Sequence, residues 1–539
     1  MTDKASPLGT VRQVTFDLLR GFGIDTVFGN PGSTELPFLD AWPNDIRYVL
    51  GLQESSVVGM ADGYAQATGN AAFVNLHSAA GVGHALGNIY TAFRNQTPMV
   101  ITAGQQVREL LPMHPYLFAE QATEFPKPYV KWSCEPARAE DVPAAIARAY
   151  YTAMQKPCGP TFVSIPIDDW NVPAQMPPVR TVARDVAPDP ALLKSLAEAL
   201  DRSERPALVV GPQIDQENAW DAVVQLAEAT NAAVWVAPFS SRASFPERHP
   251  LFQGFLPAAP RAVGNALQSY DTVVVLGAPV FTFHVAGQCD LFVRDVPLFQ
   301  ITDDPTAAAR AAVGTSIIGS LRLGLPGLLG MIGARDRQPP PRRQMPPRPA
   351  PSMPIRAEYL LHVLSEILPE RAIVVEEVPS HRPALQDHLP FDRPGSFITM
   401  ASGGLGFGLP AAVGFALADP SRRVVCIVGD GSSMYSFQAL WTAAQHRASL
   451  TIVIVNNRGY GAMRAFSQVL GVRNPPGIDL PDLDFVQLAA GLGCPGRRVS
   501  QSDDLKDALQ EACRSTGPYL VEVDVDPRIP HLYDKAAKA

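Results

Sequence analysis

The sequence has no long apolar run, no excess of positive charge and no closely spaced cysteines. No segment is long, apolar and uncharged enough to cross a bilayer, and residues 1–4 do not open an apolar signal-peptide core. The net charge is −8 at pH 7 and no stripe of Lys or Arg is present, which argues against a nucleic-acid partner. We expect a globular cytoplasmic protein that binds neither membrane nor nucleic acid.

The six cysteines are scattered, at positions 134, 158, 289, 426, 494 and 513. None of them forms a CxxC pair, so neither a disulfide framework nor a cysteine metal site is expected. We interpret them as reduced thiols, which is typical of a cytoplasmic protein.

Two proline-rich stretches, residues 172–190 and 338–354, divide the chain. Proline favours extended linkers there, and 539 residues are too many for one hydrophobic core. We predict an N-terminal domain at 1–180, a central domain at 190–337 and a C-terminal domain at 355–539. Within each block, short β-branched apolar runs alternate with helical patterns, which is typical of α/β domains with a parallel sheet flanked by helices.

The apolar runs give the positions of the expected strands. They cover residues 26–29, 48–50, 72–76 and 99–103 in the first block, 207–211, 233–236 and 272–277 in the second, and 372–375, 424–428, 450–455 and 519–523 in the third. The gap between residues 101 and 162 is long for one crossover connection, so we expect it to hold an active-site loop.

Two strands of the third block carry the chemistry. One ends in Gly-Asp-Gly-Ser at 429–432 and the other in Asn-Asn at 456–457. Asp430 and Asn457 should lie side by side, because open α/β sheets bind ligands at the carboxyl ends of neighbouring parallel strands. A carboxylate, an amide oxygen and nearby glycines suit Mg²⁺ that shares its ligand shell with phosphate. Either half alone is an ordinary turn, whereas both together resemble the diphosphate-binding motif of thiamin diphosphate enzymes.

Further segments extend this resemblance to nearly the whole chain apart from the linkers. They are Gly-Asn-Pro-Gly-Ser-Thr-Glu-Leu-Pro-Phe at 29–38, Gln-Glu at 53–54, Leu-His-Ser-Ala-Ala-Gly at 76–81, Gly-Ala-Pro-Val-Phe at 277–281 and Gly-Gly-Leu-Gly-Phe at 403–407. They resemble the benzoylformate decarboxylase family, within the thiamin-diphosphate-dependent 2-oxo acid decarboxylases and acetolactate synthases. The resemblance implies decarboxylation of an aromatic 2-oxo acid, benzoylformate to benzaldehyde and CO₂, with aldehyde carboligation as a side activity.

The resemblance also implies roles for single residues. Glu54 would activate the cofactor through its aminopyrimidine, and Ser33 would contact the substrate carboxylate. His77 and His284 would move protons, since a histidine titrates near working pH. The expected Mg²⁺ ligands are Asp430, Asn457 and the carbonyl of Gly459; the other expected cofactor contacts are Gly403, Leu405, Gly429, Gly431, Ser432 and Tyr460; and the expected pocket residues are Pro379, Met463 and Phe466.

Simpler interpretations exist for some of these residues. An acid at a helix start, such as Glu54, is commonly only a cap, and a lone histidine is commonly structural. Pro379 and Arg382 stand where the family is rich in hydroxyl residues, which leaves the polarity and shape of the pocket open. Four histidines without a matching motif are interpreted as structural, namely His84, His114, His249 and His446.

Alternative functions differ in what they require of the sequence. An acetolactate-synthase-like carboligase, or a decarboxylase of a branched or aliphatic 2-oxo acid, is the nearest rival. A pyruvate decarboxylase would carry an adjacent His-His pair, and none is present. A cofactor-binding protein without turnover would have lost Glu54 or the histidines. In the resembled family the domains that carry Glu54 and Asp430 meet across subunits, so a homodimer is expected, pairing into a homotetramer.

Overall fold

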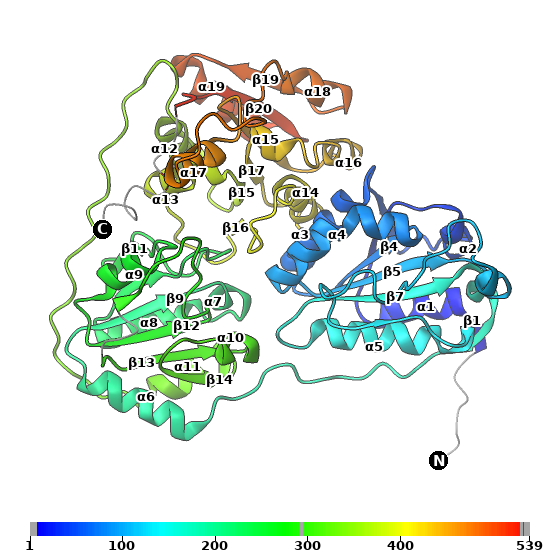
Figure 1. Ribbon diagram of the computed structural model, residues 1–539, viewed down its shortest axis with the longest axis horizontal. Helices are drawn as coiled ribbons and strands as arrows, with labels where there is room; N and C mark the ends of the chain where they lie inside the picture. The colour runs from blue at the N-terminus through cyan, green and yellow to red at the C-terminus, as the bar shows by residue number, and fades with distance from the viewer. Residues whose placement is uncertain (1–7, 291–294, 529–531, 533–539) are drawn as a thin grey trace.

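The computed structural model describes residues 8–290, 295–528 and 532. The chain forms three successive lobes, coloured blue to cyan, green, and yellow to red in Figure 1. Each lobe is built on one six-stranded sheet in which all neighbouring strands run parallel, with helices packed against it. The α/β fold class that the sequence predicts is therefore confirmed. None of the helices among the described residues has the length and apolar character of a membrane span.

The N-terminal lobe has the strand order β3-β2-β4-β5-β7-β6. Its strands are β2 (Thr26–Gly29), β3 (Arg47–Leu50), β4 (Ala72–Leu76), β5 (Met99–Gln105), β6 (Ser133–Cys134) and β7 (Pro160–Pro166). The longer helices of this lobe are α1 (Val11–Gly21), α3 (Glu54–Thr68), α4 (Ser78–Asn95) and α5 (Val142–Met154). A short antiparallel pair, β1 (Leu8–Thr10) with β8 (Pro173–Gln175), lies beside them. The strands β2, β4, β5 and β7 are buried throughout, as expected when helices cover both faces of a parallel sheet.

The central lobe has the strand order β11-β10-β9-β12-β13-β14. Its strands are β9 (Pro206–Val210), β10 (Ala233–Val236), β11 (Phe252–Phe255), β12 (Thr272–Leu276), β13 (Leu298–Thr302) and β14 (Thr315–Ile318). Its longer helices are α6 (Pro190–Arg202), α8 (Trp220–Thr230) and α11 (Leu321–Leu329). Their leucines, valines and alanines pack against one face of the sheet in a continuous core.

The C-terminal lobe has the strand order β16-β15-β17-β18-β20-β19. Its strands are β15 (Ile373–Glu377), β16 (Phe397–Thr399), β17 (Val424–Gly429), β18 (Leu450–Asn456), β19 (Gly496–Val499) and β20 (Tyr519–Asp524). Its helices include α12 (Ala357–Ile367), α13 (Arg382–His388), α14 (Gly408–Ala418), α15 (Asp430–Ser433), α17 (Gly461–Leu470) and α19 (Ser502–Arg514). The strands β17 and β18 lie in the middle of the sheet, so their ends are fixed by neighbours on both sides.

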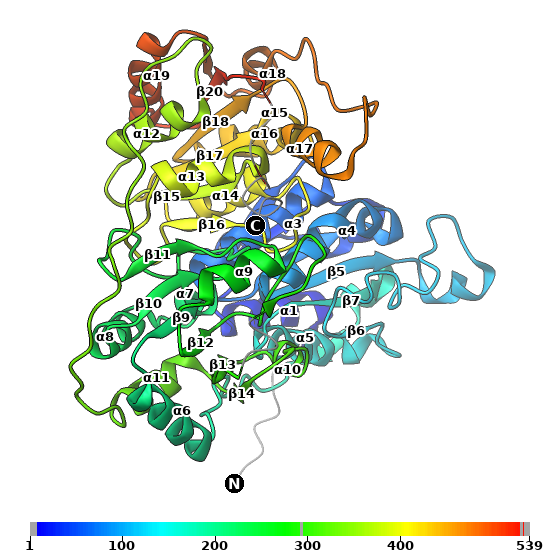
Figure 2. The same ribbon diagram turned by 60° about the vertical axis from the view of Figure 1, so that its left-hand side comes forward.

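The two predicted linkers are extended. Residues 176–189 and 331–354 contain no helix or strand. Both run along the outside of the molecule between lobes, as Figures 1 and 2 show from two directions. The domain limits at 180, 190, 337 and 355 stay a prediction.

The helices α3 and α14 join the N-terminal and C-terminal lobes through a contact between their backbones. A Cβ atom on Gly63 would lie 2.1 Å from the carbonyl oxygen of Ala411. A Cβ atom on Gly414 would lie 2.0 Å from the carbonyl oxygen of Met60. Only glycine fits at these two positions, because the atoms in the way belong to the main chain and cannot rotate aside.

An arginine of the central lobe connects all three lobes. Arg242 Nη2 donates to Gln66 Oε1 of α3 at 2.6 Å, and its Nη1 donates to Asp215 Oδ2 at 2.6 Å. Asp215 Oδ1 in turn accepts from the backbone N–H of Gly395 in the C-terminal lobe at 2.7 Å. Arg242 and Asp215 are nearly buried, so this charge-assisted network is little screened by water.

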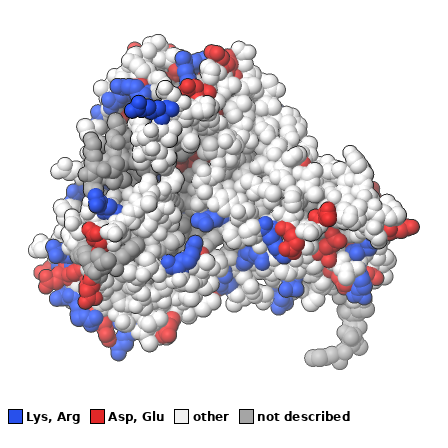
Figure 3. Space-filling model, viewed as in Figure 1, with Lys and Arg blue, Asp and Glu red and all other residues white. Residues whose placement is uncertain are grey.

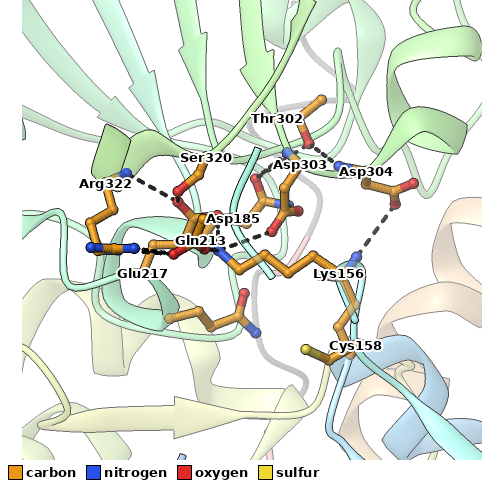
Figure 4. Close-up of polar contacts among 12 residues, drawn as sticks. Lys156, Cys158, Asp185, Gln213, Glu217, Thr302, Asp303, Asp304, Ser320 and Arg322 are labelled. Atoms are coloured by element: carbon orange, nitrogen blue, oxygen red, sulfur yellow. Dashed lines mark hydrogen bonds and ion pairs between the residues drawn. The ribbon is translucent and has the colours of Figure 1, made fainter. Parts of the chain in front are cut away.

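A second ionic cluster joins the N-terminal lobe, the first linker and the central lobe (Figure 4). Lys156 Nζ lies 2.9 Å from Asp185 Oδ1, 2.7 Å from Glu217 Oε1 and 3.6 Å from Asp303 Oδ2. The carboxyl groups of Glu217 and Asp303 influence each other's titration, and the pKa of Glu217 is lowered. Burial, together with the neighbouring carboxylate of Glu217, raises the pKa of Asp303 to about 7.

We predict that Asp303→Asn flattens the pH dependence of stability between about pH 4 and pH 7. Because the pKa of Asp303 is raised on folding, its contribution is complete below the ordinary aspartate pKa and is lost as the pH rises to about 7. The pKa of Glu217 is lowered on folding, so its contribution to stability has the opposite pH dependence. That contribution is lost as the pH falls at the acidic end of the range. The free energy of unfolding across this range should therefore fall less in the variant, by on the order of 1.4 kcal/mol for each unit by which folding raises the pKa of Asp303. Melting temperatures measured across the range check this.

Asp336→Asn is the matched control, since it removes an exposed carboxylate of the second linker. Its curve should run parallel to that of the wild type. Parallel curves for Asp303→Asn as well would show that Asp303 does not hold the proton.

Candidate active site

Asp430 and Asn457 lie where the sequence places them, at the carboxyl ends of two adjacent strands. Asp430 directly follows β17 and is the first residue of α15, and Asn457 directly follows β18. The two strands are paired in parallel, with Gly429 opposite Val455. Asp430 is 3% exposed and Asn457 is 2% exposed. Their shared edge of the sheet is therefore a buried polar site.

The Asp430 carboxylate is held by backbone groups. Its Oδ1 accepts from the N–H of Gly431 at 2.8 Å, and its Oδ2 accepts from the N–H of Gly459 at 2.8 Å. Burial raises the pKa of Asp430, and these N–H groups lower it. The carbonyl of Gly459 accepts from the N–H of Gly461 at 3.0 Å and keeps a second lone pair.

Asn457 supplies an oxygen that lacks a protein partner. Its Oδ1 is buried and accepts no hydrogen bond from the described residues. A buried acceptor without a donor, next to a buried carboxylate, fits a hard cation such as Mg²⁺. The described residues contain no cluster of three or more His, Cys, Asp or Glu able to hold a metal. A cation here would therefore be held by one carboxylate, amide and carbonyl oxygens, and phosphate.

The residues around this edge include a glycine that packs closely against an aromatic ring. A Cβ atom on Gly431 would lie 2.5 Å from Cε1 of Tyr460. A residue larger than glycine at position 431 would therefore clash with that ring. Ser432 follows in the first turn of α15, and Gly429 precedes it at the end of β17. These are the positions at which the sequence predicts cofactor contacts.

The glycine-rich turn before α14 is fixed by a residue that the sequence analysis missed. Glu377, at the end of β15, accepts from the N–H of Gly406 at 2.7 Å and of Phe407 at 2.8 Å. Burial raises the pKa of Glu377 to about 7, although the backbone donors oppose this. The turn also contains Gly403, in the left-handed region with φ of 74°, and Leu405, which is half-buried. Two adjacent glutamates directly after an apolar run were the available signal for Glu377.

Ser33, Glu54 and His77 come together in the N-terminal lobe. Ser33 begins a 3-10 turn after β2, Glu54 is the first residue of α3, and His77 is the residue before α4. A Cβ atom on Gly81 would lie 3.3 Å from Glu54 Oε1 and 3.6 Å from Cβ of His77, and a Cβ atom on Gly32, the residue before Ser33, would lie 2.3 Å from the His77 ring. The Ser33 side chain faces solvent, whereas the Glu54 side chain is 13% exposed. This lobe therefore presents a hydroxyl, a carboxylate and an imidazole on one surface.

A second missed residue, Glu35, holds His77. Glu35 Oε2 lies 2.9 Å from His77 Nδ1, and its Oε1 accepts from the N–H of Gly104 at 2.9 Å. The Thr34 hydroxyl lies 3.0 Å from the same ring nitrogen. The hydrogen bond to Glu35, which is 1% exposed in its side chain, raises the pKa of His77. His77 is thereby kept closer to its protonated form.

His84, for which the sequence predicts a structural role, lies beside Glu54. Its Nδ1 lies 3.1 Å from Glu54 Oε2. His77 and His84 flank the first two turns of α4, and this spacing of seven residues was the available signal. The other histidines left as structural are His114, His249 and His446.

His284, of the central lobe, packs against the C-terminal lobe. Its ring centroid lies 4.7 Å from that of Phe466 on α17, in an edge-to-face arrangement, and 5.8 Å from that of Phe239. Met463, one turn before Phe466, is 53% exposed. The predicted pocket residues Met463 and Phe466 thus share one surface with His284.

Arg382 forms a contact between lobes, whereas Pro379 stays a predicted pocket residue. Pro379 opens a short turn, and Arg382 begins α13. Arg382 Nη1 donates to Glu376 Oε2 at 2.9 Å, and its Nη2 donates to the carbonyl of Ser240 in the central lobe at 2.9 Å. The guanidinium is therefore engaged in an interlobe contact.

Comparisons with known proteins agree with this architecture. The family models for the N-terminal, central and C-terminal domains of thiamine pyrophosphate enzymes match residues 9–123, 193–328 and 377–523. The benzoylformate decarboxylase of Pseudomonas aeruginosa is 45% identical over 95% of this chain and 98% of its own length. The large subunit of acetolactate synthase isozyme 2 of Escherichia coli is 28% identical, over 94% of each chain.

Two solved structures are similar throughout. The benzoylformate decarboxylase of Polynucleobacter necessarius has a TM-score of 0.93 at 42% identity, covering 96% of this chain and 99% of its own. The 4-hydroxybenzoylformate decarboxylase of Rhodococcus jostii has a TM-score of 0.92 at 41% identity, with the same coverage. Fold and site thus define a thiamin-diphosphate-dependent enzyme, and the chain belongs to the benzoylformate decarboxylase family.

We predict that Glu35→Gln lowers the pKa of His77, because the amide cannot stabilise the imidazolium as the carboxylate does. The ring resonances of His77 can be titrated by NMR in protein labelled at histidine. The turnover rate should fall roughly 10²-fold, within the range of a general acid or base. Glu120→Gln, which neutralises an exposed carboxylate of the same lobe, is the control and should leave both unchanged. An unchanged pKa of His77 in Glu35→Gln would remove Glu35 from the proton-transfer machinery.

Proposed function

We propose that the protein is a thiamin-diphosphate- and Mg²⁺-dependent decarboxylase of an aromatic 2-oxo acid, with benzoylformate as the substrate and benzaldehyde and CO₂ as the products. One observation carries this proposal: Ser33 and His77 share one surface of the N-terminal lobe with Glu54, in a chain that also has the buried Asp430–Asn457 edge. The benzoylformate and 4-hydroxybenzoylformate decarboxylases reported above support the choice of substrate. Aldehyde carboligation is proposed as a side activity.

The residues present fit the cofactor and its metal. Asp430, Asn457 Oδ1 and the Gly459 carbonyl would hold Mg²⁺, and the glycines at 429 and 431 with Ser432 and Tyr460 would line the diphosphate. Thiamin diphosphate, when bound, supplies an electron sink for the carbon that loses CO₂. Glu54 would hydrogen-bond the aminopyrimidine, and Leu405 with the Gly403 carbonyl would set its position.

The remaining residues would act on the substrate. The exposed hydroxyl of Ser33 would donate to the substrate carboxylate. His77, biased toward its protonated form by Glu35, would donate a proton, and His284 would handle a second proton transfer. The side chains of Phe466, Met463 and Pro379 would enclose the ring of the substrate. The aromatic ring of Phe466 would favour an aromatic ligand.

We also propose that the active unit is a homodimer, paired into a homotetramer. Figure 3 shows a broad area with few charged side chains in the upper part of the face in view, with Lys and Arg side chains along its lower margin. Large apolar side chains are exposed near both parts of the site, among them Met113 at 66%, Tyr116 at 89% and Leu470 at 71%. Such exposed apolar surface is typical of an interface. The scattered cysteines are consistent with the cytoplasmic location that we propose.

We predict that kcat/KM for benzoylformate exceeds that for pyruvate by at least about 10-fold, the range that an apolar pocket provides. CO₂ release should require both thiamin diphosphate and Mg²⁺. Ser33→Ala should lower kcat/KM for both substrates by roughly 10–100-fold, because a hydrogen bond to a charged group is lost. Ser352→Ala, in the second linker, is the control. A preference for pyruvate would instead favour the aliphatic decarboxylase or the acetolactate-synthase-like carboligase.

We predict that two inactive variants complement each other. Glu54→Gln and Asp430→Ala remove groups from the N-terminal and C-terminal lobes, respectively. If each site combines these lobes from two subunits, a mixed dimer has one site with both residues intact. Random exchange of equal amounts should restore about a quarter of wild-type activity, since half of the dimers are mixed and one of their two sites is complete. Demonstrated subunit exchange without recovered activity, or an active monomer in light scattering, would refute the shared site.

A further inference from the structure

We propose that His381 is a positioning residue that fixes the side-chain amide of Asn457 so that Oδ1 faces the divalent cation. The inference rests on the proposed Mg²⁺-dependent function. It concerns the group that orients a ligand, and it explains why Asn457 can serve as a ligand in a site with a single carboxylate.

The first observation is the contact between the two side chains. His381 Nε2 lies 3.5 Å from Asn457 Nδ2. An amide nitrogen only donates, so the ring nitrogen must accept, which places the imidazole proton on Nδ1. His381 is 9% exposed and Asn457 is 2% exposed, so water competes little for this contact.

The second observation is the free end of the same amide. Asn457 Oδ1 is buried and has no hydrogen-bond partner among the described residues. Turning the amide by half a revolution would direct its NH₂ group at the cation and its oxygen at His381. A cation repels the NH₂ group, so the cation and His381 both favour the same orientation.

The third observation is how firmly the imidazole is held. His381 ends the short turn Pro379–His381, and its backbone N–H donates to the carbonyl of Val378 at 2.9 Å. The preceding Ser380 Oγ accepts from the N–H of Ala462 at 2.9 Å, which ties this turn to the start of α17. The imidazole therefore approaches Asn457 from a turn anchored at both ends.

Gly461 makes the contact possible. A Cβ atom there would lie 2.7 Å from Asn457 Nδ2 and 2.9 Å from Ser380 Oγ. Any larger residue would push the amide and the turn apart. The space that Gly461 leaves is thus occupied by the Asn457 amide and the Ser380 hydroxyl, side by side.

The test measures Mg²⁺ affinity rather than turnover. Mg²⁺ is titrated by calorimetry into metal-free enzyme at saturating thiamin diphosphate. His381→Leu should weaken Mg²⁺ binding about 10–100-fold, as is typical when a group that orients a metal ligand is lost. His381→Gln keeps an acceptor and should lose less. His388→Leu, on the neighbouring helix α13, is the control for removing a half-buried histidine and should bind as wild type does.

A double variant separates orientation from general support. In an Asn457→Asp background either side-chain end is an oxygen, so no orientation is needed. Adding His381→Leu there should change Mg²⁺ affinity little, whereas an equal loss in both backgrounds would mean that His381 only supports the fold and would overturn the inference. If circular dichroism shows that His381→Leu is unfolded, His381→Gln is compared in the wild-type and Asn457→Asp backgrounds instead, and the same criterion applies.

Two further outcomes tell this inference from the function on which it rests. Wild-type Mg²⁺ affinity in folded His381→Leu would overturn the role of His381 and leave the proposed function standing. A wild-type enzyme that binds no Mg²⁺ with thiamin diphosphate would overturn the proposed function and this inference together.

Discussion

The backbone contact between α3 and α14 sets the geometry on which both parts of the site depend. Gly63 and Gly414 let the two helices touch main chain to main chain, and an added methyl group would meet a carbonyl at about 2 Å in either direction. The helix α3 begins at Glu54, and α14 follows the turn that contains Leu405. Because the contact involves backbone atoms that cannot repack, it fixes the distance between the two lobes more firmly than side-chain packing would. Any change at this crossing would move Glu54 and the glycine-rich turn together.

Buried carboxylates hold the loops around this frame. Glu377 binds the N–H groups of the glycine-rich turn, Glu35 binds those of Gly32 and Gly104, and Asp62 accepts from Thr97, Asn95 and Gln66. A buried carboxylate is costly unless it is fully hydrogen-bonded, so each of these groups favours one loop conformation strongly. The loops that carry Ser33, His77 and Leu405 are therefore ordered by acids that do not themselves face the pocket.

The central strands and their ends could be predicted from the sequence, because β-branched runs such as those of β17 and β18 stop at Gly-Asp and Asn-Asn. All predicted strands are present, with ends that differ by at most two residues. The strands that were missed in the three six-stranded sheets are mostly interrupted by polar residues, proline or glycine, and they are β6, β7, β11, β13, β14, β16 and β19. Glu35 and Glu377 were missed because their partners are distant in sequence: Gly104 lies 69 residues from Glu35, and Gly406 lies 29 residues from Glu377. The chemical roles of Ser33, Glu54, His77 and His284 stay predictions, since a placement does not establish a role.

In both parts of the site, buried acids accompany polar side chains that reach solvent. Glu35 and Asp430 are almost fully buried, while Ser33 and His284 reach solvent. The polar groups of each surface are therefore held in place before a substrate binds. In the proposed dimer, association would not have to order flexible side chains at the reacting centre, which would keep its entropic cost low. The exposed apolar residues beside each surface would then stabilise the proposed dimer by burying apolar area. The polar groups among them are already held by hydrogen bonds within their own lobe.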